Sequence, residues 1–347
     1  MKIKITPFQL SLTHQWAIAS DVKTGGKTSY GTVFLELEED GVIGLGEAAP
    51  SSRYQENTET VTAFLKLIDP KKLSFDNLDA SLKYLEQVAP GNYAGKTAVN
   101  IALLDGAARK KGQAIYDFLG LGFTEKKHLT SFTIGIDKPE MIRKKVCEAA
   151  IYPILKLKVG GPDDRLNLAA LRDAAPTKTV RVDGNEGWKT KEEALENIEW
   201  FAKDGHVEYV EQPMPASSNP KDLMWLKERS PLPLFGDESY HHASDVNFCA
   251  DCFHGVNVKL IKTGGISGGF EALQAARKAG LKTMVGCMIE SSIEITAAAH
   301  LAELTDHFDI DGNILISNDP YLGVTSFNGM LSFAQTPEKI GLRVRAR

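Results

Sequence analysis

Cysteine is scarce in this sequence, with four residues among 347. So few thiols exclude a small disulfide-bonded scaffold and suit the reducing cytoplasm. No apolar run is long enough to span a membrane, and residues 1–6 alternate polar and apolar side chains, unlike the continuous apolar core of a signal peptide. We therefore expect a cytoplasmic protein that makes no contact with a membrane.

The sequence also has no large excess of positive or negative charge. It contains 40 basic and 45 acidic side chains, and its net charge is −5. A nucleic-acid-binding surface needs clustered positive charge, so we expect no nucleic-acid partner. A chain of 347 residues can bury a large core. This length fits one large barrel and a smaller domain.

The first 125 residues are typical of an α+β unit. Strand-like alternation near residues 2–12, 29–39 and 42–48 predicts a three-stranded meander, and helical periodicity follows from Asn57 to about Lys111. The segment around residues 20–27 is rich in turn formers, which predicts a loop that touches the substrate.

A repeat of short apolar strands and helix-like segments begins after residue 125. The strands are centred near Thr133, Lys156, Val182, Val210, Phe235, Val258, Val285 and Phe308. Eight such units predict an α/β fold with a (β/α)7–8 TIM-type barrel over residues 126–320, because parallel strands need crossover helices. The last unit is expected to be incomplete, and residues 321–347 to pack back on the capping domain formed by residues 1–125.

Three successive predicted strands each end in one carboxylate, namely Asp183, Glu211 and Asp237. The carboxyl ends of barrel strands converge on one rim, where three carboxylates would repel one another unless a hard cation neutralised them. A set of oxygen ligands with room for water suits Mg²⁺, so we predict a magnesium site. Taken singly, each residue has the simpler interpretation of a helix cap or an ion-pair partner.

Two lysines share one face of the predicted strand at residues 154–159, because Lys156 and Lys158 alternate with apolar neighbours. An edge strand with a solvated lysine face is the alternative. Beyond the carboxylates, parity favours Lys259 over Lys262 as a rim residue, because Lys262 falls past the strand end.

Lys158 precedes the carboxylate series and Lys259 follows it, so the two amines are expected to approach the metal from opposite sides. Two such bases can remove a proton from one face of a carbon acid and return one to the other face. This chemistry is epimerisation or racemisation. Lys156 is expected to act as an electrostatic helper that lowers the pKa of Lys158.

These residues resemble the muconate-lactonizing branch of the enolase superfamily. The resemblance rests on short motifs at Lys156–Lys158, Glu211–Pro213, Gly236–Ser239 and Lys259–Gly265, and on the stretch Gly44–Pro50. It extends over nearly the whole chain and implies the same barrel, the same capping domain and a Lys base working with Mg²⁺.

The pair Asp309 and Asp311 departs from a generic member of this branch. It is similar to the pair with which dipeptide epimerases hold the α-ammonium group of their substrate, and two carboxylates outside the metal series form a cation site. The simpler interpretation is a pair of caps at the barrel rim. The resemblance also implies that Thr133 and Met288 line the substrate pocket.

The sequence therefore predicts a Mg²⁺-dependent dipeptide epimerase that inverts the α-carbon of the carboxyl-terminal residue. A muconate cycloisomerase or an o-succinylbenzoate synthase would use the same metal and lysines, and a non-catalytic metal-containing barrel would need neither lysine. Barrels of this kind often self-associate, so a homo-oligomer stays open. Cys249 and Cys252 have metal-ligand or redox spacing, but no second such pair completes a zinc site.

Overall fold

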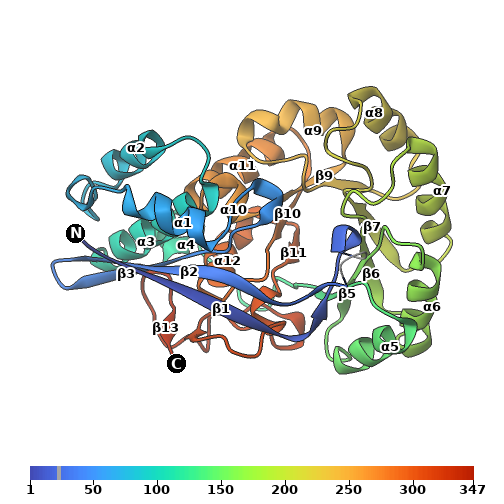
Figure 1. Ribbon diagram of the computed structural model, residues 1–347, viewed down its shortest axis with the longest axis horizontal. Coiled ribbons are helices and arrows are strands. Elements are labelled where there is room, and N and C mark those ends of the chain that lie inside the picture. Colours follow the sequence, from blue (N-terminus) through green and yellow to red (C-terminus); the bar gives the residue numbers. More distant parts are fainter. Residues whose placement is uncertain (22–24) are drawn as a thin grey trace.

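The computed structural model describes residues 1–21 and 25–347. It contains an antiparallel three-stranded sheet and a parallel eight-stranded sheet. Figure 1 shows the three-stranded sheet and its helices to one side of the ring that the parallel strands and their outer helices form. This is a TIM-type barrel with a separate α+β unit, so the predicted fold class is confirmed.

The predicted meander is confirmed. It consists of β1 (Lys2–Trp16), β2 (Lys27–Glu39) and β3 (Val42–Ala48), in the order β1-β2-β3. Asp40 and Gly41, with φ of 53° and 79°, form the turn between the last two strands. β1 runs four residues past the predicted end at residue 12, because a shift in register between Ser11 and Trp16 lets pairing with β2 resume.

The helices of this part of the chain are α1 (Thr58–Lys66), α2 (Leu78–Val88), α3 (Tyr93–Lys110) and α4 (Ile115–Phe118). α3 is buried along most of its length and packs against β3. A Cβ atom at Gly46 would lie 1.9 Å from the carbonyl oxygen of Ala98, so only glycine permits this close approach of strand and helix.

All eight predicted barrel strands are present. They are β4 (Phe132–Ile134), β5 (Ile154–Lys158), β6 (Thr179–Asp183), β7 (Val207–Glu211), β8 (Leu234–Gly236), β9 (Gly255–Val258), β10 (Lys282–Gly286) and β11 (His307–Asp309). They pair in sequence order from β4 to β11. A parallel bridge between Thr130 and Phe308, with a hydrogen bond of 3.2 Å from Ser131 N to Phe308 O, closes the ring.

The outer helices connect these strands. They are α5 (Pro139–Glu148), α6 (Asp164–Ala174), α7 (Lys191–Ala202), α8 (Pro220–Arg229), α9 (Val246–Cys252), α10 (Leu260–Thr263), α11 (Ile266–Lys278) and α12 (Ser292–Ala299). Where a helix would follow β11, the chain forms only a 3-10 turn at Gly312–Ile314, as the incomplete last unit predicts. Among the described residues, no helix has the length and apolar character that a membrane crossing requires.

The carboxyl-terminal segment runs back along the amino-terminal elements. The backbone N–H of Gly341 donates to the carbonyl of Gln113 at 2.7 Å, and that of Leu342 donates to Asp105 Oδ1 on α3, also at 2.7 Å. The short strands β12 (Tyr321–Leu322) and β13 (Arg345–Ala346) pair with each other. The domain boundaries at residues 125 and 320 stay a prediction.

Candidate active site

Three buried carboxylates converge at the carboxyl ends of adjacent barrel strands. Asp183 ends β6, Glu211 ends β7 opposite it in register, and Asp237 follows β8. Each residue offers one carboxylate oxygen, and these oxygens lie within 4.8 Å of one another. The structure thus brings together the three residues that the sequence pattern selects as metal ligands.

The donor set suits a hard divalent cation. Glu211 is fully buried, and its Oε2 atom has no hydrogen-bond partner among the described residues, although Lys156 Nζ lies 2.7 Å away outside hydrogen-bonding geometry. Burial and the neighbouring Asp183 carboxylate raise the pKa of Glu211 to about 7. An all-oxygen set of three neighbouring carboxylates suits Mg²⁺.

Lys158 and Lys259 flank the carboxylates from opposite sides of the ring. Lys158 Nζ donates to Asp183 Oδ2 at 2.6 Å, and Lys259 Nζ donates to Asp237 Oδ2 at 2.7 Å. Lys158 ends β5 and Lys259 follows β9, with β6, β7 and β8 between them. In a closed ring of eight strands, four steps are half the circumference.

Two further lysines, Lys156 and Lys262, form ion pairs with these carboxylates. Lys156 Nζ lies 3.0 Å from Asp183 Oδ2 and 2.5 Å from Asp309 Oδ2. Lys262 Nζ donates to Asp237 Oδ1 at 2.7 Å, and to the carbonyls of Asp237 and Asn257.

Lys262 is a residue that the sequence pattern passed over. It does lie beyond the strand end, as expected, but α10 turns its side chain back under Asp237, where it is 1 % exposed. Of this pair, only Lys259 lines the cavity of about 360 Å³ at this end of the barrel. The preference for Lys259 as the pocket residue therefore agrees with the geometry, whereas the contact of Lys262 with Asp237 was missed.

A cavity of about 360 Å³ opens beside the carboxylates. The side chains predicted to act on the substrate lie along its wall, namely Lys158, Lys259, Thr133, Met288, Asp309 and Asp311. Of the loop predicted to touch the substrate, Ser20, Asp21 and Lys27 also line the cavity. Residues 22–24 of that loop lie outside the described residues.

The two carboxylates of the predicted ammonium site have different surroundings. Asp309 accepts hydrogen bonds from Ser131 Oγ at 2.8 Å and Thr133 Oγ1 at 3.2 Å, while its other oxygen pairs with Lys156. Burial alone would raise the pKa of Asp309, but the nearby ammonium groups lower it to about 2.

Asp311 Oδ2 accepts a hydrogen bond of 2.6 Å from the backbone N–H of Thr133. Burial and the adjacent charge of Asp309 raise the pKa of Asp311 to about 7. An ammonium group bound here would relieve that repulsion, so the pair retains the character of a cation site.

The capping domain covers the mouth of the cavity through the 3-10 turn Ser52–Tyr54. Arg53 forms an ion pair with Glu186 in the loop after β6, and the ring of Tyr54 lies 5.4 Å from that of His241 in the loop after β8. These contacts join the amino-terminal unit to two loops that also border the carboxylate triad.

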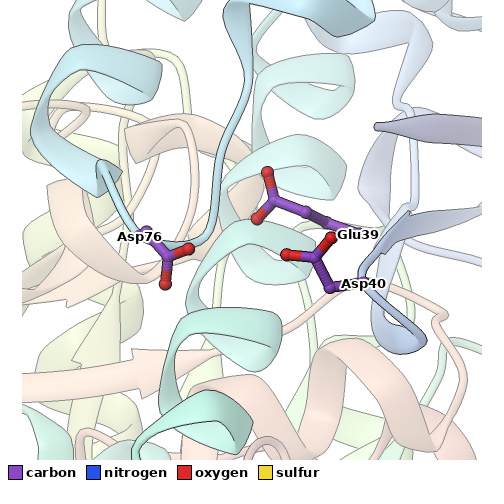
Figure 2. A group of neighbouring side chains, drawn as sticks. All are labelled: Glu39, Asp40 and Asp76. Atoms are coloured by element: carbon purple, nitrogen blue, oxygen red, sulfur yellow. The ribbon is translucent and has the colours of Figure 1, made fainter.

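A second carboxylate cluster lies away from this cavity. Figure 2 shows Glu39 and Asp40, at the turn between β2 and β3, facing Asp76 in the loop before α2. Lys110 Nζ already lies 2.7 Å from Asp76 and 3.3 Å from Asp40. Because this ammonium group neutralises part of the charge and the group is largely solvated, we assign it no ligand.

The cysteine pair with metal-ligand spacing lies on α9. Cys249 and Cys252 are both buried free thiols, and Cys249 Sγ lies 3.3 Å from the carbonyl of Ser239. Burial raises the pKa of Cys252 to about 11, so this thiol is neutral near pH 7.

The family models and relatives that match this chain are consistent with this geometry. Residues 141–344 match the family model described as enolase C-terminal domain-like, and residues 5–120 match that of the mandelate racemase / muconate lactonizing enzyme N-terminal domain. An L-Ala-D/L-amino acid epimerase of Pedosphaera parvula is 66% identical over 348 residues, which is 100% of both chains. An L-Ala-D/L-Glu epimerase of Bacteroides thetaiotaomicron is 37% identical, over 97% of this chain and 86% of its own length.

Solved structures give the same result. The substrate-liganded L-Ala-D/L-Glu epimerase of Bacillus subtilis superposes with a TM-score of 0.91 at 27% identity, covering 100% of this chain and 98% of its own. A dipeptide epimerase of Cytophaga hutchinsonii, complexed with Mg and D-Ala-L-Val, has a TM-score of 0.90 at 26% identity, covering 99% and 95%. The chain therefore belongs to the enolase superfamily, in the family of mandelate racemase and muconate lactonizing enzyme.

Proposed function

We propose that this protein is a Mg²⁺-dependent dipeptide epimerase that inverts the α-carbon of the carboxyl-terminal residue. The observation that carries the proposal is the position of Lys158 and Lys259, which face one cavity from opposite sides of a buried carboxylate triad. Relatives named as an L-Ala-D/L-amino acid epimerase and an L-Ala-D/L-Glu epimerase, with 66% and 37% identity over almost the whole chain, support the same assignment.

In this proposal Asp183, Glu211 and Asp237 hold the cation. When bound, Mg²⁺ neutralises the charge that develops on the substrate carboxylate as the α-proton leaves. Lys156, which is fully buried against two of these carboxylates, adds a fixed positive charge beside the same position.

The proton transfer is shared between the two lysines. One neutral amine takes the α-proton, the electron pair of the broken C–H bond moves into the substrate carboxylate, and the ammonium group on the opposite face supplies the proton for the new C–H bond. Burial lowers the pKa of Lys259, but the Asp237 carboxylate has the opposite effect, and the pKa is on balance raised well above its usual value. This amine is therefore held protonated beside Asp237. A cation that shared Asp237 would weaken this effect and make neutral Lys259 accessible.

Asp309, Asp311 and Thr133 would bind the amino end of the dipeptide, and Met288 would form part of the pocket wall. This acidic pair disfavours the two alternative enzymes, cycloisomerase and succinylbenzoate synthase, because their substrates are anions without an ammonium group. A non-catalytic barrel would leave the opposed lysines without a purpose. The names of the relatives favour L-Ala at the amino end of the substrate.

We also propose a cytoplasmic location, which the four free cysteines support. Self-association stays a prediction.

Proton exchange in deuterated water is the direct test. An L-Ala dipeptide incubated with the Mg²⁺-loaded protein should take up deuterium at the α-carbon of its second residue and yield both epimers. Lys158→Ala and Lys259→Ala should each lower epimerisation by about 10³-fold or more, because removal of one base leaves one face without a proton carrier. Each variant should still exchange the proton of one epimer through the remaining lysine. Epimerisation that survived both single substitutions would contradict the two-base assignment.

A further inference from the structure

Two buried oxygen atoms beside the metal ligands have no donor within the described protein. They are Asn185 Oδ1 and Glu238 Oε2. Both residues line the cavity, and Glu238 is only 8% exposed. A buried acceptor without a donor is destabilising, so we expect the contents of the cavity to supply one.

Both residues are tied to the metal ligands through the backbone. Asn185 follows Asp183 by two positions, and its backbone N–H donates to Asp183 Oδ1 at 2.9 Å. Asn185 adopts a left-handed backbone conformation, with φ of 40°. Glu238 is the residue after Asp237.

The two side chains also contact each other across the mouth of the site. Asn185 Nδ2 lies 3.4 Å from Glu238 Oε1, which orients the amide so that Oδ1 is left without a partner. One residue comes from the loop after β6 and the other from the loop after β8, so together they span the strand that bears Glu211.

The chemistry of the cation identifies the missing donor. Mg²⁺ prefers six oxygen ligands and gives up its water reluctantly, and three protein carboxylates with one substrate carboxylate leave room for retained water. Water bound to a divalent cation is a strong hydrogen-bond donor. Acceptors adjacent in sequence to two of the ligands are well placed to receive its protons.

We propose that Asn185 and Glu238 form an outer shell that accepts hydrogen bonds from the hydration water of Mg²⁺, and so favours Mg²⁺ over cations that shed their water. This inference rests on the proposed function for the presence of the metal. It adds two positioning residues to the three ligands, and it gives a reason for the Asp-Gly-Asn and Asp-Glu sequences at these two strand ends.

Metal binding without substrate tests this directly. Mg²⁺ and Ca²⁺ are titrated separately into the protein by isothermal titration calorimetry, with Asn185→Gly and Glu238→Gln as variants. Glycine accepts the positive φ of residue 185, and glutamine has the shape of glutamate, so both variants should fold. Circular dichroism melting checks this for each, and either variant alone is sufficient.

Each variant should bind Mg²⁺ about tenfold more weakly, as is typical for the loss of an outer-shell partner. Its affinity for Ca²⁺ should change less than about twofold, because Ca²⁺ binds with fewer constraints on its water. The matched control is Glu186→Gln, which removes the same charge near the cavity at a carboxylate already paired with Arg53 and with the N–H of Ala216. It should leave the preference for Mg²⁺ over Ca²⁺ unchanged.

Unchanged Mg²⁺ affinity in the variants would overturn the inference. So would an equal loss for both cations, because that result would show a general effect of charge or packing. A wild-type protein that bound neither cation would instead overturn the proposed function. The two failures are therefore distinguishable in one set of titrations.

Discussion

Lys262 shows how a single buried charge supports the site without reaching the substrate. Its ammonium group makes three contacts of 2.6–2.9 Å with Asp237 and Asn257. Removing it leaves the buried Asp237 carboxylate with Lys259 as its remaining ammonium partner among the described residues, and the loss of one partner of a buried ion pair is strongly destabilising. We therefore expect Lys262→Met to lower the free energy of unfolding by about 3 kcal/mol in metal-free protein.

Saturating Mg²⁺ should restore part of this stability, because a cation beside Asp237 replaces the missing charge. Urea denaturation with and without Mg²⁺ measures both effects, and Lys278→Met on the exposed end of α11 is the matched control. Equal losses with and without Mg²⁺ would indicate that Lys262 acts only through packing.

Asp311 permits a test of substrate recognition that does not touch the metal. Asp311→Asn should raise the KM for a dipeptide by roughly 10- to 100-fold, because a hydrogen bond between two charged groups is worth about 1.5–3 kcal/mol. Binding of the N-acetylated dipeptide, which has no ammonium group, should be nearly unchanged. Steady-state kinetics and competition binding measure the two values, with Asp222→Asn on α8 as control. A matching loss for the acetylated ligand would refute the ammonium site.

Strand-end position was enough to select the residues that the structure brings together, because polar side chains at the carboxyl ends of barrel strands share one rim. It could not select Lys262 or Asn257. Lys262 returns to the site through a helical turn, and Asn257, in the middle of β9, donates to Glu211 Oε1 at 2.7 Å. Such contacts depend on the three-dimensional path of the chain and leave no spacing in the sequence.

The residue directly after α12 is a histidine whose surroundings fit only the neutral ring. His300 Nδ1 accepts a hydrogen bond from the backbone N–H of Tyr116 at 3.1 Å, and Nε2 donates to the carbonyl of Leu342 at 3.0 Å. Burial lowers the pKa of His300 from 6.5 to about 3. Between these pH values the unfolded chain binds a proton that the folded chain does not.

The stability that His300 contributes is therefore fully present above pH 6.5 and is lost as the pH falls toward 3. We expect it to weaken by up to about 1.4 kcal/mol for each pH unit in this window. His300→Gln keeps one donor and one acceptor but cannot titrate. The free energy of unfolding of this variant should therefore fall less steeply as the pH decreases. Urea denaturation of both proteins at pH 7.5 and 5.5 gives the comparison, and parallel declines would rule out this histidine as the cause.

Among the secondary-structure elements, the barrel strands were the most predictable. Each is a short run with apolar residues, as burial on both faces favours, and β5 to β9 and β11 end in a charged residue or are followed at once by one. The short helices α4 and α10 were not predicted, because four residues contain too little periodicity to distinguish a helical turn from a loop.

The end of the chain is tied to the amino-terminal part of the molecule. Asp105 on α3 is fully buried and accepts hydrogen bonds from Leu342 N at 2.7 Å, Leu45 N at 2.9 Å and Arg109 Nε at 2.8 Å. Leu342 and Val344 are themselves buried. One carboxylate thus joins a strand, a helix and the carboxyl-terminal segment.

Deletion of residues 341–347 should destabilise the whole protein by several kcal/mol. Each of the two apolar side chains contributes about 1.5–3 kcal/mol through burial, and Asp105 would lose a buried donor. Deletion of only residues 345–347, which are exposed, is the control and should cost far less. Thermal melting and limited proteolysis report the difference, and two deletions of equal effect would contradict this role of the segment.

Alternation near residue 321 predicted that the chain returns to the capping domain, and the contacts with Gln113 and Asp105 are of this kind. Their partners could not be predicted, because residues 105 and 342 are far apart in the sequence and neither forms part of a motif. Contacts of this type are decided by the packing of two finished units.

The half-ring separation of Lys158 and Lys259 has a consequence for the direction of the proposed reaction in the cell. Either stereoisomer can enter, since each presents its hydrogen to one amine and its bare face to the other, and the same path runs backward. A catalyst leaves the equilibrium untouched, and two diastereomers of a small flexible peptide differ little in energy. Net flow would therefore follow whichever isomer neighbouring metabolism consumes, and the protein itself would impose no preferred handedness.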